Sequence, residues 1–213
     1  MSYGEAVAFK QLFPAHHIPV ILLSLLQAGV ALRKKADNER EDRITNRLCR
    51  LLIRIPEFRD GPLDVHLQPE ILSNDPDEDT PGGKIDLLVS CAKGHEVYFA
   101  IEAKRLRVCS TGGRVTYPGS YPYVQEGMMR FISGQYASQM RAGAMLGYVF
   151  DGKIDKARFS IDKSIRNKAK VLKMKPPGGL TRSTILAEMP IDETGHELVE
   201  RFFTIYHVLV AVG

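Results

Sequence analysis

The chain has only three cysteines among its 213 residues, and it lacks both a long apolar run and an internal repeat. Cys49, Cys91 and Cys109 are odd in number, widely spaced and without a C-x-x-C pair, which excludes a disulfide framework and a zinc knuckle and favours a reducing compartment. The longest apolar run, residues 18–32, is interrupted by two polar residues and follows no basic leader, so it fits neither a membrane span nor a signal peptide. We therefore expect a cytoplasmic protein without a membrane partner.

The overall composition is ordinary for a globular protein. Hydrophobic residues make up 44% of the chain and charged residues 25%, which excludes disorder and a collagen-like fibre. A chain of this length can be held together by its core alone, and we expect one domain over residues 1–213. The formal net charge of +4 gives by itself only a slight indication of a polyanionic partner.

Apolar spacing, with glycine and proline between the segments, predicts a mixture of helices and strands. A helix is predicted over 18–35, and a second over 37–55 because Ile44, Leu48 and Leu51 recur at three- and four-residue steps. Further predicted elements are strands over 63–72, 83–91, 96–104 and 144–150, helices over 125–142 and 155–169, a long loop over 107–124, and strands over 183–190 and 201–212, with a helix over 197–206 as the alternative. The pattern indicates an α/β fold with a mixed central sheet of about four or five strands flanked by α-helices, in which the short connection 92–95 makes its two strands antiparallel.

Two acidic residues lie in the first turns of the second predicted helix. Glu41 falls on the apolar face of that predicted helix, one turn before Ile44. Glu39 points the opposite way and is expected in solvent.

Three ionisable residues on two predicted strands indicate a catalytic or metal-binding site. Alternation places Glu102 and Lys104 on one face of strand 96–104, and Asp86 interrupts an apolar run on the strand before it. A carboxylate buried without a partner is costly, so a compensating group is expected. Mg²⁺ prefers oxygen ligands, which Asp86 and Glu102 can each supply. Lys104 then lies near the water that such a metal activates.

Ile85-Asp86, followed after fifteen residues by Glu102-Ala103-Lys104, resembles the PD-(D/E)XK nuclease superfamily, which includes restriction endonucleases and many DNA-repair and phage-defence nucleases. The resemblance implies a restriction-endonuclease-like core in which Asp86, Glu102 and the backbone carbonyl of Ala103 bind catalytic Mg²⁺, with Mn²⁺ as a substitute. It also implies that Lys104 acts on the water.

The resemblance further implies that Glu41 is the additional acidic residue of many members, and it covers residues 37–150. Those residues form the expected catalytic core, between a helical lead-in and a basic segment with C-terminal strands (1–36 and 151–213). The motif's proline is replaced by Ile85, and Tyr136 lacks the spacing to Gln135 and Gln139 that marks the exonuclease branch. Endonuclease and exonuclease activity therefore both stay open.

The charge is unevenly distributed along the chain. Residues 153–182 contain ten basic and two acidic residues, a net charge of +8, which leaves −4 for the rest. Such a segment suits DNA phosphates as a partner. The expected DNA-binding residues are Arg105, Arg107 and Arg114 after the catalytic strand, Arg130 and Gln135 on the helix over 125–142, and Lys163 and Lys168 in the basic segment.

Plainer interpretations remain for several of these residues. Lys104 can form a buried salt bridge with Asp86 or Glu102, with Glu41 as a local cap. Glu70 either joins the metal site or faces water. The acidic loop at 74–83 begins like a calcium loop but lacks the required glycine, so a solvated turn is favoured.

The sequence thus predicts a Mg²⁺-dependent nuclease that hydrolyses DNA, an endonuclease effector in restriction or phage defence, whose specificity comes from a homodimer or a partner subunit. The alternative is a non-catalytic nucleic-acid-binding or subunit-docking module that keeps the fold. A third interpretation, a small-molecule metalloenzyme, predicts activity that survives high salt.

Overall fold

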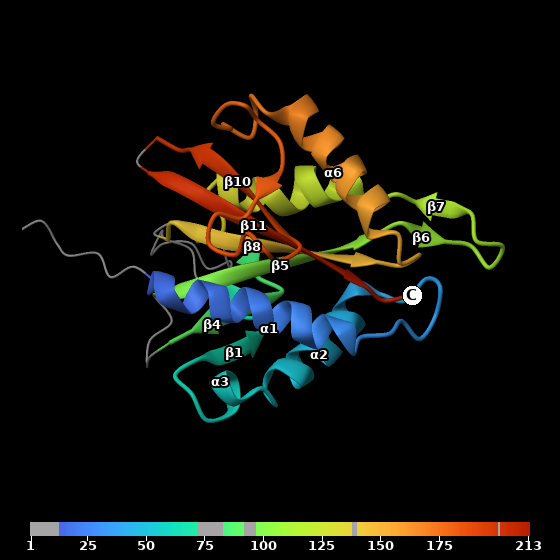
Figure 1. The fold of residues 1–213 in the computed structure, drawn as a ribbon, viewed down its shortest axis with the longest axis horizontal. Helices are drawn as coiled ribbons and strands as arrows, with labels where there is room; N and C mark the ends of the chain where they lie inside the picture. Colours follow the sequence, from blue (N-terminus) through green and yellow to red (C-terminus); the bar gives the residue numbers. More distant parts are fainter. Residues whose placement is uncertain (1–12, 72–82, 92–96, 138–139, 200) are drawn as a thin grey trace, which may run out of the picture.

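A mixed sheet of seven strands runs through the computed structural model (Figure 1), which describes residues 13–71, 83–91, 97–137, 140–199 and 201–213. The spatial order is β1 (Asp64–Leu67), β4 (Leu87–Ser90), β5 (Tyr98–Leu106), β8 (Ala142–Val149), β11 (Phe202–Ala211), β10 (Ile191–Glu197) and β9 (Thr181–Arg182). Strand β8 is parallel to both β5 and β11, and the other neighbours are antiparallel. The sheet is therefore mostly antiparallel. Two small ribbons pair β2 (Glu70–Ile71) with β3 (Gly83–Lys84) and β6 (Val108–Cys109) with β7 (Val115–Tyr117).

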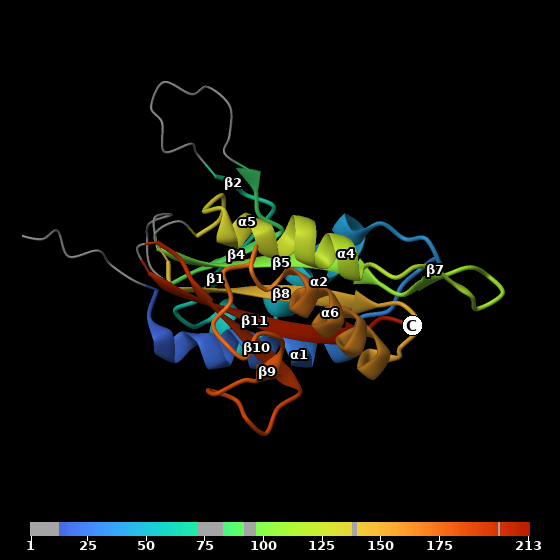
Figure 2. The same ribbon diagram turned by 90° about the horizontal axis from the view of Figure 1, so that it is seen from above.

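Helices cover both faces of this sheet, which makes the fold α/β. The helical segments are the 3₁₀ turn η1 (Ala15–His17), α1 (Ile18–Val30), α2 (Glu41–Leu52), α3 (Pro56–Arg59), α4 (Ser120–Pro122), the π-helix η2 (Tyr123–Met128), α5 (Met129–Ile132) and α6 (Ile154–Lys168). Helix α1 packs on β11 and α2, and η2 packs on β5 and β8 beside α6. Figure 2 shows α1 on one side of the sheet and α4 and α5 on the other.

Helix α2 forms for the reason the sequence suggests. Ile44, Leu48 and Leu52 recur on one face and are fully buried, while arginines occupy the opposite face. The acidic Glu41 begins the helix, where a negative charge interacts favourably with the helix dipole. The helix is shorter than the predicted 37–55, and Pro56 begins α3 soon after it.

The feature that positions the candidate site is a break shared by two strands. Gln68 N–H donates to the Asp86 carbonyl at 3.0 Å, and Ile85 N–H donates to the Pro69 carbonyl at 3.2 Å. Beyond this point the β2–β3 ribbon leaves the plane of the main sheet (Figure 2). The pairing of β4 with β5 ends at Leu87, so the later residues of β5 have a strand neighbour only on the β8 side. Backbone N–H groups on the open side of β5 therefore need other acceptors.

Several predicted elements are confirmed and others are wrong. The antiparallel pairing across residues 92–95 is confirmed by β4 and β5, although that turn itself lies outside the described residues. The predicted strand over 183–190 is wrong because the next strand, β10, begins only at Ile191. The alternative helix over 197–206 is also wrong, since β11 begins at Phe202. The main sheet has seven strands rather than four or five.

The helix predicted over 125–142 has different limits. Helical structure begins earlier, at Ser120, and α5 ends at Ile132. Gly134 and Ala137 have φ of 81° and 53°, values that a right-handed helix does not contain. The predicted loop over 107–124 contains the β6–β7 ribbon and the start of this helical segment. The acidic residues 74–82 lie outside the described residues.

Glu39 was expected in solvent, and this expectation is wrong. Its side chain is buried because α2 begins only at Glu41, so helical periodicity does not apply to it. The Arg47 guanidinium donates to both Glu39 carboxylate oxygens at 2.7 and 2.8 Å and holds the pKa of this carboxyl below its usual value. Within the described residues, no helix combines the length and the hydropathy needed to cross a membrane.

Candidate active site

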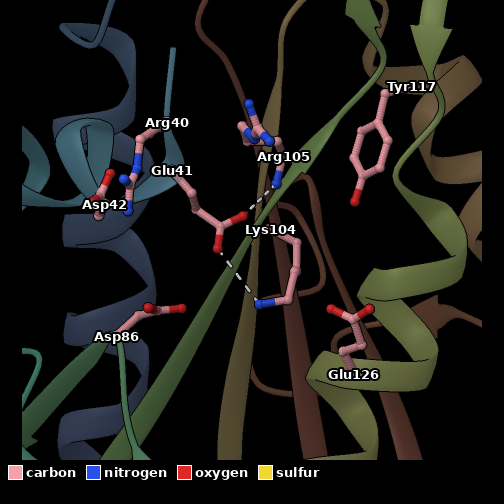
Figure 3. A pocket seen from close by; sticks show the side chains of 8 residues that line it. All are labelled: Arg40, Glu41, Asp42, Asp86, Lys104, Arg105, Tyr117 and Glu126. Carbon is pink, nitrogen blue, oxygen red and sulfur yellow. Dashed lines mark hydrogen bonds and ion pairs between the residues drawn. The ribbon is translucent and has the colours of Figure 1, made fainter. Parts of the chain in front are cut away.

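A polar pocket of about 310 Å³, called here the site pocket, opens at the first residue of α2 beside β5 (Figure 3). It is lined by Arg40, Glu41, Asp42, Asp86, Lys104, Arg105, Tyr117 and Glu126. Three of the four predicted catalytic residues, Glu41, Asp86 and Lys104, thus come together from separate segments. The fourth, Glu102, is fully buried against Lys104.

Two site carboxylates accept hydrogen bonds from the open side of β5. Ala103 N–H donates to Asp86 Oδ2 at 2.8 Å, and Arg105 N–H donates to Glu41 Oε2 at 2.7 Å. These N–H groups would donate to carbonyls of β4 if β4 continued alongside β5. Asp86 lies in the break between β3 and β4, rather than inside a continuous strand as predicted. The divergence of β4 from β5 therefore exposes the two backbone N–H groups that hold the Asp86 and Glu41 carboxylates in place.

The Lys104 ammonium lies at the centre of the cluster. Its Nζ donates to Glu102 Oε1 at 2.5 Å and to the Ala103 carbonyl at 2.9 Å, and it lies 3.5 Å from Glu41 Oε1. Figure 3 shows the ammonium between Asp86 on one side and Glu126 on the other. The predicted salt bridge between Lys104 and Glu102 is therefore present, and it is one contact among several.

Arg130 is the second cation on Glu102. Its Nη1 donates to Glu102 Oε1 at 2.8 Å and to the Tyr136 hydroxyl oxygen at 2.7 Å. The Tyr136 hydroxyl in turn donates to the Lys84 carbonyl, two residues before Asp86. This chain of bonds joins α5 and β5 to the segment that carries Asp86. Arg130 was predicted to bind DNA, and here its guanidinium is engaged with a site carboxylate.

One oxygen of Glu102 has no partner. Oε1 accepts from both Lys104 and Arg130, whereas the buried Oε2 has no hydrogen-bond partner among the described residues. An unsatisfied buried carboxylate oxygen is costly, and most buried polar atoms are paired. Gly127 allows the π-helix to lie over this region, since a Cβ there would lie 2.4 Å from Met145 Cε and 3.5 Å from Glu102 Cγ.

The electrostatics of the cluster follow from burial. Burial, followed by the nearby Asp86 charge, raises the pKa of Glu102 to about 7 against the opposing effect of Lys104 and Arg130. Burial also raises the pKa of Glu41. For Lys104, burial acts to lower the pKa, but the charges of Glu102 and Glu41 outweigh it, so the net shift is upward. Lys104 is therefore a charged ammonium ion, and burial disfavours the ionised forms of the Glu41 and Glu102 carboxyl groups beside it.

The donors fit a small divalent cation in chemistry. Asp86 and Glu102 offer carboxylate oxygens and Ala103 offers a carbonyl, which are ligands that Mg²⁺ accepts. The unpartnered Glu102 Oε2 is the observation that favours a cation ligand at this position. Among the described residues, no three His, Cys, Asp or Glu side chains converge into a metal-binding group, so this set relies on two side chains and one carbonyl.

Other predicted residues lie outside the site pocket. The Arg107 guanidinium forms an ion pair with Asp151, with Nη2 and Oδ2 at 2.7 Å. Arg114 is exposed beside β7, and Gln135 lies after the end of α5, next to Gly83. Lys163 and Lys168 lie on α6, and Glu70 is exposed on β2. Arg105 does line the pocket, and its guanidinium also stacks over Tyr117 at 5.8 Å.

Sequence reasoning missed four pocket residues, namely Arg40, Asp42, Tyr117 and Glu126. Tyr117 ends β7, in a segment predicted as loop, and Glu126 lies in the π-helix, which places an exposed carboxylate opposite Asp86 across Lys104 (Figure 3). Hydrophobic periodicity gives no sign of a π-turn, although such turns are frequent at functional sites.

The fold and the pocket define an α/β protein with a cluster of carboxylates, one lysine and several arginines where two strands of its sheet diverge. Comparison of the chain with protein-family models, with curated proteins and with solved structures finds no match.

Proposed function

We propose that the protein is a Mg²⁺-dependent nuclease that hydrolyses phosphodiester bonds of DNA, with a restriction-endonuclease-like core of the PD-(D/E)XK type. The observation that carries the proposal is the unpartnered, buried Glu102 Oε2 next to the Lys104 ammonium, with Asp86 held on the adjacent backbone. A purely structural ion pair would satisfy both oxygens of its carboxylate.

In this proposal Asp86, Glu102 through Oε2 and the Ala103 carbonyl hold the cation. When bound, Mg²⁺ lowers the pKa of water and offsets negative charge on the phosphoryl group. Water oxygen forms a new bond to phosphorus and gives up a proton to solvent, the ester P–O bond breaks, and the leaving oxygen takes up a proton.

Lys104 has a raised pKa and so keeps its proton, which favours orientation over deprotonation. Its ammonium can donate to the water or to a phosphate oxygen at the pocket it lines. Glu41 Oε1 keeps the ammonium in place from the other side at 3.5 Å. Arg130 fixes Glu102 through Oε1, which leaves Oε2 for the cation.

The competing function is a non-catalytic binding module. One observation favours it: Asp86 and Glu41 each accept a backbone N–H, a structural role that needs no chemistry. That function leaves the unpartnered Glu102 Oε2 unexplained. It also predicts that wild type has no nuclease activity for substitutions at Glu102 and Lys104 to change.

The test is incubation of supercoiled plasmid, linear duplex and single-stranded DNA with Mg²⁺ or Mn²⁺. Wild type is expected to cleave, and Glu102→Gln and Lys104→Ala are expected to lower the rate by about 100-fold or more, the range of a lost positioned group. Glu70→Gln is the matched control, because it removes an exposed carboxylate that does not line the site pocket. Cleavage of circular plasmid distinguishes an endonuclease from an exonuclease.

Absence of metal-dependent cleavage by wild type, or equal cleavage by Glu102→Gln and Glu70→Gln, would refute the proposed function. Activity on small phosphodiesters alone, insensitive to salt, would indicate the small-molecule enzyme instead, because DNA binding weakens as salt rises.

A further inference from the structure

Helix α2 carries a row of arginines on the face opposite its buried one. Arg43, Arg47, Arg50 and Arg54 follow one another at steps of four, three and four residues, which places them along one side of the helix and the turn after it. We call these four residues the α2 basic stripe. Glu41, at the start of the same helix, belongs to the site pocket. One helix therefore contributes a site carboxylate and a line of cations leading away from it.

The surface beside this stripe is hollowed without interruption from the site pocket. The site pocket shares Asp42 with a second hollow of about 400 Å³. The second hollow shares Lys35 and Arg47 with a third one of about 340 Å³. Among the described residues, the third hollow is lined by no acidic side chain and by six basic ones, Arg33, Lys34, Lys35, Arg47, Arg50 and Arg54.

Most cations of the stripe are available to a ligand. Arg47 is neutralised by Glu39, which accepts from both ends of its guanidinium. Arg43, Arg50 and Arg54 are exposed, and within the described chain their guanidinium groups form no ion pair with a carboxylate. Guanidinium groups present a fork of donors that matches phosphate oxygens.

The basic segment 153–182 differs from the stripe in its position, and its three arginines form ion pairs. Arg158 is paired with Asp192 at 2.6 Å, and Arg166 with Asp162 at 2.8 Å. Helix α6 lines none of the three hollows, and Figure 1 shows it across the strands from α2. The excess of charge that is most conspicuous in the sequence is thus not continuous with the site pocket.

We propose that the α2 basic stripe binds the phosphate backbone of the DNA on one side of the cleavage point. The eleven residue steps from Arg43 to Arg54 span about 16 Å at the rise of a helix. That length matches about five base pairs of duplex, so the cations are spread along a polymer rather than gathered around one small anion. The inference rests on the proposed function, since the site pocket is where the strand would be cut.

The test measures binding of the full-length protein to a fluorescent duplex of about 20 base pairs, with a chelator present so that no cleavage occurs. The charge-reversal variant Arg50→Glu/Arg54→Glu is compared with Lys163→Glu/Lys168→Glu on α6. Arg50 and Arg54 are exposed and outside the site pocket, so their replacement leaves the fold and the pocket intact.

The α2 variant is expected to bind at least about 10-fold more weakly at moderate salt, and its plot of log K against log salt is expected to be less steep by about two, one unit for each lost phosphate contact. The α6 variant is expected to bind like wild type. An unchanged α2 variant, an equal loss in both variants, or a stronger loss in the α6 variant would overturn the assignment. So would binding of an acidic peptide, but not of DNA, at the stripe.

A separate measurement distinguishes this failure from failure of the proposed function. Metal-dependent hydrolysis of bis(p-nitrophenyl) phosphate reports on the site pocket without needing the stripe. Unchanged hydrolysis with weakened DNA binding in the α2 variant supports both proposals. If wild type hydrolyses this substrate and the α2 variant binds DNA as tightly as wild type, the proposed role of the stripe is refuted and the proposed function is not.

Discussion

Replacing His207 with glutamine is expected to reduce the loss of stability that accompanies acidification. The reason is a buried chain of hydrogen bonds in which every proton has a fixed place. His196 Nδ1 contacts the Leu172 carbonyl at 2.7 Å, and because a carbonyl only accepts, this nitrogen carries the proton. Thr194 then donates to His196 Nε2 at 2.8 Å and accepts from His207 Nε2 at 3.0 Å. His207 Nδ1 is left to accept from the Tyr123 hydroxyl at 3.0 Å.

Both histidines are therefore neutral in the folded protein. Burial lowers the pKa of His207 to about 3 and that of His196 to about 4. The unfolded chain has the ordinary value of 6.5, so below that pH the unfolded state takes up protons that the folded state does not. Stability is thus present above pH 6.5 and is lost as the pH falls. At about pH 5.5, one unit below the unfolded pKa, each histidine contributes a loss of about 1.4 kcal/mol.

Glu102 acts in the opposite direction. Its folded-state pKa of about 7 lies above the ordinary value of 4.5, so acidification to about pH 5.5 stabilises the protein by about 2 kcal/mol through this group. The net change in the stability of wild type with pH therefore does not report on the histidines by itself. The comparison with His207→Gln isolates the histidine, because glutamine does not titrate and keeps an N–H donor for Thr194.

The assay is urea unfolding followed by circular dichroism at about pH 7.5, 6.5 and 5.5. Wild type is expected to lose about 1.4 kcal/mol more than His207→Gln over this range, whatever the absolute stability of the variant. His16→Gln, which removes an exposed histidine, is the control and is expected to follow wild type. Equal losses in wild type and His207→Gln would show that His207 is not held neutral in the core.

Two further substitutions test the packing around the site. Gly127→Ala brings a Cβ to 2.4 Å from Met145 Cε, and the strain is expected to lower stability by about 1–3 kcal/mol in thermal or urea unfolding; an unchanged midpoint would show that Met145 moves aside without cost. Tyr136→Phe removes the hydroxyl that joins Arg130 to the Lys84 carbonyl, with an expected loss of about 1–2 kcal/mol. Wild-type stability of that variant would contradict a bracing role for the bond.

Local patterns were sufficient to predict much of the fold. The spacing of Ile44 and Leu48 predicts α2, and the short connection between the strands around Asp86 and Glu102 predicts their antiparallel pairing. Strand β10 was missed because its inward residues include Asp192, Thr194 and His196, whose burial depends on partners elsewhere in the chain. A pattern of apolar alternation cannot reveal such a strand.

The site was predicted in part for similar reasons. Asp86, Glu102 and Lys104 were identified from their positions and Glu41 from the family resemblance, and the structure brings them together. The burial of Glu39 was not foreseeable, because it depends on where α2 begins and on Arg47 eight residues away. The place of Glu126 depends on a π-turn, and the continuity of the α2 basic stripe with the site pocket depends on tertiary structure.

The hydrogen bonds on the open side of β5 have a consequence for how this protein can change over evolution. Asp86 and Glu41 occupy N–H groups that would otherwise form an unpaired strand edge, a template for aggregation through strand addition. A descendant that had lost the proposed activity would still be selected to keep both carboxylates. Glu102 Oε1 still holds Lys104 and Arg130, but its Oε2 accepts no bond among the described residues, so the fold does not require that second oxygen. Among diverged copies, a change from glutamate to glutamine at position 102 would therefore report loss of the proposed activity more directly than changes at positions 41 and 86.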